Sequence, residues 1–248
     1  MKSLHIAAII TLLVFVASCT TTTSTRRHPT LTKQLEYIDS VVVIPPRVEI
    51  EYVTLTGENE RLTEQEDTVR IHLITMAEHR LKRCGYDVVE FDFEDAIKSN
   101  EEFAYTVTQV REGFDQAKKE LQLGKGLTIE EATTLKASIG EVVNVIAEAT
   151  GADAILLMRY EGFEKSKGYK SKDIGTSILV GVLTGIVPVA APTGAITEVA
   201  LIDGATGDVL WADIMGGALG PSVAATAMST LPIDVDPVGD ANLVEVNE

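Results

Sequence analysis

The first residue with clear chemical potential in this sequence is Cys19. It follows an apolar run from Ile6 to Val16 and two small residues, and Lys2 supplies a positive charge before the run. A charged start, an apolar stretch and small residues before a cut are the three parts of an export signal. A cysteine directly after the cut is the acceptor for lipid in a lipoprotein. We therefore expect residues 1–18 to be a lipoprotein signal peptide and Cys19 to be the lipidation site.

The lipid would be the anchor, because the apolar run is too short to span a bilayer, which takes about 20 apolar residues. Two or more acyl chains give stable attachment, whereas one chain is marginal. The alternative is an ordinary secretory signal with a chance cysteine. Thr20 stands where an aspartate usually retains Gram-negative lipoproteins at the inner membrane. We therefore expect a palmitate-type anchor in the cell outer membrane, on its periplasmic face.

The spacing of the histidines does not match that of a metal-binding pair on a helix. His72 and His79 lie seven residues apart on one predicted helix, whereas zinc-binding pairs on helices are four apart. We interpret them as part of a solvated face, and we expect neither a metal nor a cofactor.

Catalytic motifs are also missing from the sequence. The glycine-rich stretches 124–126 and 162–168 do not end as a phosphate-binding loop does, and no serine lies in a Gly-x-Ser-x-Gly elbow. Glu90, Asp92 and Asp95 form the one carboxylate group that would favour a periplasmic enzyme. We interpret them as loop charges at a strand end, so a non-enzymatic protein is expected.

The charge balance excludes some partners. The formal net charge is −16, and loss of the signal peptide with Lys2 makes it one unit more negative. This charge argues against nucleic acid, whose phosphates need a basic face. It also argues against broad electrostatic adhesion to anionic membranes. Arg26 and Arg27 could lie against lipid headgroups, although a solvated linker is the simpler interpretation.

Cys84 would be the single thiol left after lipidation of Cys19, so the mature chain has no intrachain disulfide. In an oxidising compartment such a thiol is either buried or able to cross-link two copies. Cys84 lies at a predicted helix end, where a free cysteine packs as a small hydrophobe, and we expect it to be buried.

The chain divides by composition into four parts. After the signal peptide, residues 19–38 read as a lipidated flexible tether, because Thr20 to Pro29 is polar and has no apolar periodicity. Residues 39–232 carry the pattern of one α/β periplasmic domain. Residues 233–248 form an acidic C-terminal tail.

The domain alternates strand and helix patterns. Ser40–Ile44 is a β-branched run ended by two prolines, and a second extended segment follows from Val48 to Thr54. Thr63 and Glu66 have the spacing of a capping box, which predicts a helix to about Arg83. Further elements are predicted as follows: a strand at Tyr86–Phe91, a helical region with breaks from Glu94 to Gly151, with helical spacing over Asp95–Leu121 and an apolar stripe ending at Thr150, a buried strand at Asp153–Tyr160 and a short helix at Ser222–Ser229.

The clearest hairpin joins Ile196–Ile202 to Val209–Ile214 through a loop rich in Asp and Gly. The strand, helix, strand order before it indicates parallel pairing. We therefore predict the α/β class, with a three-layer-like mixed sheet, crossover helices and a C-terminal antiparallel β-hairpin.

An apolar segment from Ile174 to Ala191, interrupted by glycines and prolines, is the one candidate interaction element. It could be core, an interface with a subunit or partner, or a membrane-inserting element. A membrane-inserting hairpin should alternate apolar and polar residues, and this segment does not alternate. The candidate interface residues are Ile178, Leu179, Val182, Leu183, Ile186 and Val187.

Three pieces of sequence carry a family resemblance: residues 40–46, residues 149–156 with their Thr-Gly-Ala-Asp start, and residues 199–211 with Asp203, Thr206, Gly207 and Trp211. In this order they resemble bacterial lipoproteins with the fold of the TolB N-terminal domain, the group that includes the curli secretion lipoprotein and uncharacterised lipoproteins. The resemblance covers roughly Ser40 to Thr230. It implies a role in envelope assembly or secretion and transfers no catalytic residue.

These observations predict an outer-membrane lipoprotein that acts without catalysis, as an accessory or assembly factor, through contacts with an envelope protein or with further copies of itself. The alternative is a subunit of an oligomeric outer-membrane secretion channel.

Overall fold

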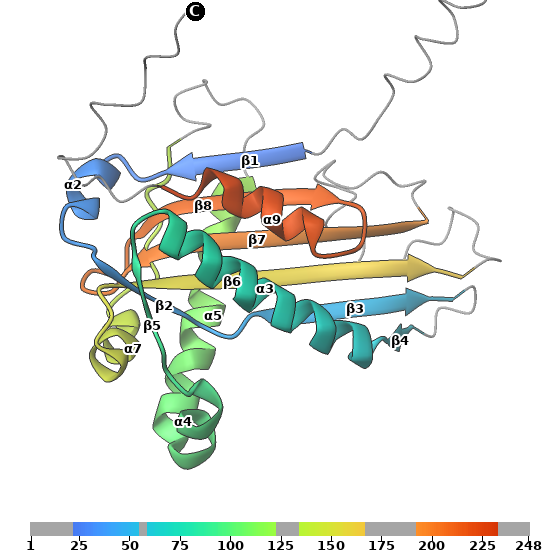
Figure 1. The fold of residues 1–248 in the computed structure, drawn as a ribbon, viewed down its shortest axis with the longest axis horizontal. Coiled ribbons are helices and arrows are strands. Elements are labelled where there is room, and N and C mark those ends of the chain that lie inside the picture. The colour runs from blue at the N-terminus through green and yellow to red at the C-terminus, as the bar shows by residue number, and fades with distance from the viewer. Residues whose placement is uncertain (1–21, 55–58, 123–133, 167–191, 233–248) are drawn as a thin grey trace, which may run out of the picture.

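A computed structural model describes residues 22–54, 59–122, 134–166 and 192–232. The eight described strands form one open mixed sheet in the order β1-β8-β7-β6-β2-β5, and β3, which also pairs with β4, pairs with the second half of β6 (Figure 1). The strands are β1 Thr22–Arg27, β2 Ser40–Val43, β3 Arg47–Val53, β4 Glu60–Arg61, β5 Asp87–Val89, β6 Ala154–Lys165, β7 Thr193–Asp203 and β8 Val209–Gly217. The helices are α2 Leu31–Leu35, α3 Thr63–Arg83, α4 Phe93–Ser99, α5 Glu101–Gln122, α7 Val142–Thr150 and α9 Ser222–Ala227, followed by the 3-10 turn η1 Met228–Thr230.

Strand β6 is the centre of the sheet. Its first half pairs in parallel with β2, where Val41 lies opposite Ala154, and its second half pairs in parallel with β3, where Arg47 lies opposite Arg159. The predicted parallel pairing of the strands on either side of α3 is confirmed, since β2 and β5 are parallel. Both faces of β6 are covered, which explains its unbroken apolar start.

Helices α3 and α9 cover one face of the sheet and lie in front of it in Figure 1. The predicted helix to Arg83 is confirmed, and its buried side chains follow helical spacing. They pack with Trp211, which is fully buried, and with Cys84, whose predicted burial is confirmed. The buried residues of α3 that form this face are Glu66, Val69, Leu73, Ala77 and Leu81.

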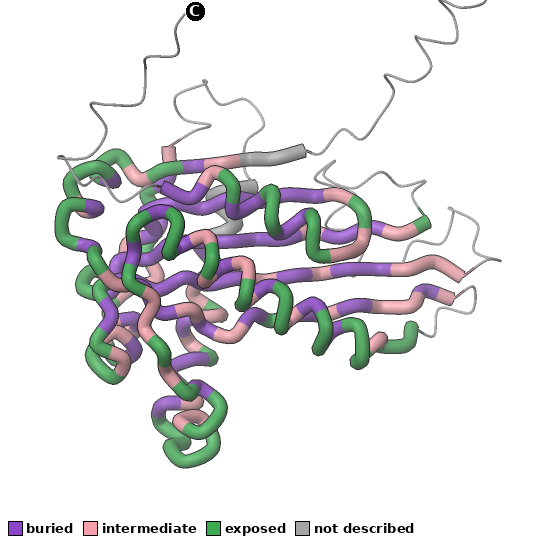
Figure 2. Tube along the Cα trace, in the orientation of Figure 1, coloured by how far each residue is buried: buried purple, intermediate pink, exposed green. Residues whose placement is uncertain are grey.

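Helices α4, α5 and α7 form the third layer, on the opposite face. The sequence predicts helical structure with breaks from Glu94 onward, and the first break is at Asn100, which is extended and separates α4 from α5. The Asn100 side chain then accepts the N–H of Phe103 at 3.1 Å, as a cap does for a new helix. Figure 2 shows the layers of the domain, with buried strands between helices whose outer sides are exposed. The three-layer α/β class and the hairpin of β7 and β8 are confirmed.

The prediction of an unstructured tether over Thr20 to Pro29 is wrong for its greater part. Residues Thr22–Arg27 form β1 and pair antiparallel with β8, where Thr25 lies opposite Asp213. Leu31–Leu35 then forms α2, and both leucines are buried. The segment needs no apolar pattern, because the neighbouring strand satisfies its backbone and Thr is β-branched. The folded domain therefore includes residues from Thr22 onward, rather than beginning at residue 39.

The predicted capping box at Thr63 is also wrong. No side chain caps the first turn of α3, and the carboxylate of Glu66 instead bonds the N–H of Ile50 at 3.0 Å and the guanidinium of Arg61. A charged donor and a buried strand N–H compete better for this carboxylate than an exposed helix N-terminus does.

Candidate functional site

The residues that the sequence singles out for function, Cys19 and the six candidate interface residues in 178–187, lie outside the described residues. The structure does place the points at which their segments join the sheet. Thr22, three residues after Cys19, begins β1. Lys165 ends β6 and Thr193 begins β7, so these two residues flank the apolar segment.

All three attachment points lie at one end of the sheet, which we call the anchor end (Figure 1). Thr22 is opposite Gly216 in β8, and Gly216 is opposite Ile196 in β7. Thr193 is opposite Glu164, and the N–H of Lys165 donates to the carbonyl of Pro192 at 2.8 Å. The start of β1 and the two strand ends that flank the apolar segment therefore lie toward the same end of the sheet, with β8 between β1 and β7.

The described part of the anchor end is closely packed. The Tyr160 hydroxyl accepts the N–H of Gly220 at 2.8 Å, and burial raises the pKa of this phenol. At Gly162 a Cβ would lie 2.5 Å from Cδ1 of Leu219, so glycine lets the loop after β8 close over β6. Lys165 lies over the Phe163 ring at 5.4 Å, and burial lowers the pKa of its ammonium group. The described side chains near Tyr160, Gly162 and Lys165 are therefore held in place by packing and hydrogen bonds.

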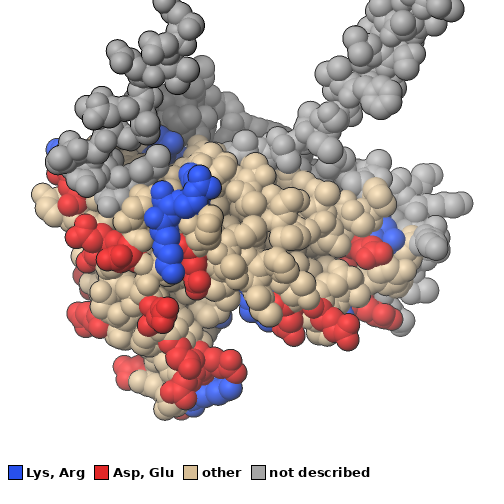
Figure 3. Space-filling view, viewed as in Figure 1, with Lys and Arg blue, Asp and Glu red and all other residues tan. Residues whose placement is uncertain are grey.

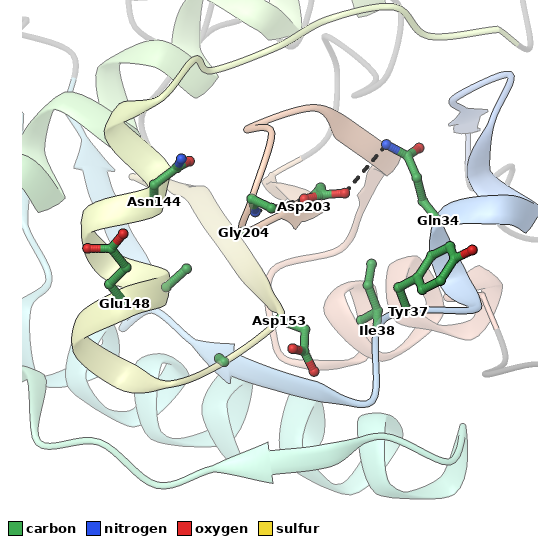
Figure 4. Close-up of a pocket in the computed structure, with 11 residues that line it drawn as sticks. Gln34, Tyr37, Ile38, Asn144, Glu148, Asp153, Asp203 and Gly204 are labelled. Atoms are coloured by element: carbon green, nitrogen blue, oxygen red, sulfur yellow. Dashed lines mark hydrogen bonds between the residues drawn. The ribbon is translucent and has the colours of Figure 1, made fainter.

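A pocket of about 450 Å³ lies at the other end of the sheet, between α2, α7 and the turn after β7 (Figure 4). Its carboxylates come from Glu148, Asp153 and Asp203, and the exposed Tyr37 stands at its rim. Gln34 donates to Asp203 at 3.4 Å across one side of it.

Two of these carboxylates hold turns together. One oxygen of Asp153 accepts from the N–H and the hydroxyl of Ser40, at 2.9 and 2.7 Å. Asp203 accepts the N–H groups of Ala205 and Thr206, at 2.8 and 3.0 Å. These hydrogen bonds hold the start of β2 beside the start of β6 and close the turn after β7.

The other sequence candidates are spread over the surface. His72 and His79 are both exposed on α3, and His72 Nδ1 lies 2.8 Å from the carbonyl of Thr68 in its own helix. Asp92 is the cap of α4, where it accepts the N–H of Asp95 at 2.9 Å. Within the described ranges no group of three His, Cys, Asp or Glu side chains could hold a metal ion.

The helices that the structure describes include none with the length and hydropathy needed to cross a bilayer.

No protein-family profile matches this sequence, and no curated protein matches it. Among solved structures, the chain is similar to the PelC dodecamer from Paraburkholderia phytofirmans, with 14% identity, a TM-score of 0.37, and coverage of 84% of this chain and 92% of that chain. It is also similar to the lipoprotein GNA1162 from Neisseria meningitidis, with 13% identity, a TM-score of 0.31, and coverage of 74% and 83%. Neither of these names the TolB N-terminal group, so that part of the resemblance stays a prediction.

Proposed function

We propose that this chain is a lipid-anchored lipoprotein of the bacterial envelope, on the periplasmic face of the outer membrane. It acts there without catalysis, as an accessory or assembly factor, through protein contacts. The observation that carries the proposal is the placement of Cys19 after Lys2, the apolar run Ile6–Val16 and two small residues.

The position of β1 adds an orientation of the domain on the membrane to this proposal. Only Thr20 and Thr21 separate Cys19 from Thr22, and three steps of extended chain span at most about 11 Å. An acylated Cys19 would therefore hold the anchor end of the sheet against the bilayer surface, rather than on a long tether. The opposite end, with Asp153, Asp203 and Glu148, would face the periplasm and present acidic side chains to a partner.

The apolar segment from Ile174 to Ala191 fits this orientation, because Lys165 of β6 and Thr193 of β7, which flank it in sequence, lie toward the same end of the sheet as the start of β1. Acyl chains on Cys19, together with an apolar segment that is joined to the same end of the sheet, favour an interface that is formed at the membrane, with lipid or with neighbouring proteins. The six candidate interface residues in 178–187 belong to this segment.

The anchor is tested by comparing the two cysteines. We expect the wild-type chain to incorporate labelled palmitate and to sediment with membranes, and Cys19→Ser to lose both properties. Cys84→Ser is the matched control, because it removes the buried thiol and leaves the signal intact. Labelling of Cys19→Ser at the wild-type level would refute the lipoprotein proposal.

The mode of action is tested by the molar mass of the lipidated chain, measured by light scattering in mild detergent. A monomer or dimer supports an accessory factor, and its partner is then sought by cross-linking in the envelope. A ring-sized oligomer would overturn the accessory proposal and favour a channel subunit.

A further inference from the structure

A second pocket, of about 460 Å³, lies where the chain turns at Pro45 and Pro46 between β2 and β3. Four arginines from four elements line it: Arg47 of β3, Arg61 of β4, Arg70 of α3 and Arg111 of α5. This is an unusual gathering of basic side chains in a chain with a formal net charge of −16. Figure 3 shows the face on which α3 lies, where acidic side chains predominate along the lower edge and basic ones show at the hollow beneath the helix.

Three of the four arginines already have an acidic partner. Arg61 contacts Glu66 at 2.8 Å, and Arg47 contacts Glu49 at 2.7 Å. Arg70 pairs with Asp67 one helical turn before it. Their charges are therefore largely balanced within the protein.

Arg111 is different. It is half-buried on α5, and its Nη2 donates to the carbonyl of Pro45 at 2.9 Å. Among the residues that the structure describes, no carboxylate lies within ion-pairing distance of its guanidinium. Burial, together with the nearby positive charges of Arg47 and Arg70, lowers the pKa of Arg111. A half-buried cation without a counter-charge is costly, and an anion would relieve that cost.

The acidic residues in the wall do not supply this counter-charge. Asp115 contacts Arg159 at 2.6 Å, and Glu49 is held by Arg47. Glu112 is exposed, so solvent weakens its attraction for the Arg111 guanidinium without removing it. The guanidinium of Arg111 is thus the unbalanced charge on the inner wall.

We propose that this pocket binds an oxyanion group, a carboxylate or a phosphate, through Arg111. The planar guanidinium fork matches two oxygens of such a group, and Arg47 and Arg70 add positive potential at the mouth. The pocket lies beside β3 and β4, on the opposite side of the sheet from β1, and none of the residues that line it belongs to β1.

The proposal is tested by equilibrium dialysis of radiolabelled inorganic phosphate against the mature lipidated chain in mild detergent, at constant ionic strength in chloride. We expect saturable binding of one phosphate per chain. Arg111→Gln should weaken it by roughly 10-fold to 100-fold, the effect of losing hydrogen bonds to a charged group. Arg83→Gln, which removes an exposed arginine at the far end of α3, should bind as the wild type does.

Glu112→Gln provides a variant that should not disturb folding, because Glu112 is exposed. It removes a negative charge from the pocket wall, and we expect about two-fold to three-fold tighter phosphate binding. Acetate is the competitor: displacement of phosphate shows that carboxylates are accepted as well, and no displacement restricts the site to phosphate. Absence of saturable binding, or equal binding by wild type and Arg111→Gln, would overturn the proposal.

Discussion

The carboxylate of Glu66 on α3 accepts the backbone N–H of Ile50 on β3 at 3.0 Å, although these residues belong to different layers. The same carboxylate receives Nε and Nη2 of Arg61 from β4, at 2.9 and 2.8 Å. Burial alone would raise the pKa of Glu66. The hydrogen bonds from Arg61 and Ile50 outweigh burial, so the pKa of Glu66 lies below its ordinary value. Glu66 therefore fastens helix to sheet in its ionised form.

We expect Glu66→Gln to lower the free energy of unfolding at pH 7 by about 1–3 kcal/mol, because the bonds from Arg61 lose their charged acceptor. Urea denaturation measures this change. Glu64→Gln is the control, since Glu64 is exposed in the same helical turn and should have little effect. Equal losses in the two variants would contradict this role for Glu66.

The stability contributed by Glu66 should also depend on pH. A carboxylate with a lowered folded pKa stabilises fully above its unfolded pKa of about 4.3, and this contribution is lost as the pH falls through the folded pKa. Urea denaturation between pH 7 and pH 3 should therefore show a smaller loss of stability in Glu66→Gln than in the wild type. Parallel pH profiles of the two proteins would disprove the assignment.

Ser40 begins β2 and Asp153 directly precedes the parallel strand β6, and hydrogen bonds join these two residues in both directions. Ser40 donates its hydroxyl to Asp153 at 2.7 Å, and the Asp153 N–H donates to the Ser40 hydroxyl at 3.0 Å. In a double-mutant cycle we expect Ser40→Ala and Asp153→Ala to show a coupling energy of about 0.5–3 kcal/mol. Ser40→Ala with the distant Thr75→Val should be additive, and an additive Ser40 and Asp153 pair would contradict the observed contact.

Gly207 in the turn of the hairpin has φ of +74°, and a Cβ there would lie 2.2 Å from the carbonyl oxygen of Gly140. Gly151 has a similar φ of +72° with open space around it. We expect Gly151→Ala to cost about 1–2 kcal/mol for the left-handed conformation. Gly207→Ala should cost about 3 kcal/mol or more, because steric overlap adds to the strain. Urea denaturation of both variants separates these two effects, and equal costs would show that the turn moves aside.

Thr25 ties the edge strand β1 to the core. Its hydroxyl donates to the fully buried Asp213 at 3.0 Å, and Thr230 donates to the same oxygen at 2.7 Å. We expect Thr25→Val to weaken the docking of β1 by about 1–2 kcal/mol. Trypsin cleavage after the buried Arg26 should then be faster, as intact-mass analysis over time would show. Thr75→Val, on an exposed face of α3, is the control, and equal cleavage rates would refute the prediction.

Local sequence patterns were enough to predict the elements that bury an apolar stripe or run. Helix α3, strand β6 and the β7–β8 hairpin were predicted because helical or strand periodicity and turn residues such as Gly207 are properties of neighbouring positions. The place of Cys84 at a predicted helix end was likewise enough to predict its burial. The signal peptide and lipidation at Cys19 are also sequence-level predictions, and they await the labelling experiment.

The tertiary structure alone decided the rest. Residues Thr22–Arg27 form a strand because they pair with the edge of β8. The polar side chains of this segment do not indicate that β8 lies beside it. Glu66 bonds Ile50 rather than its own helix end because folding brings β3 beside α3. The arginine pocket assembles Arg47, Arg70 and Arg111 from separate elements. Such contacts depend on which distant groups meet and on how water is excluded between them, and no local pattern encodes either.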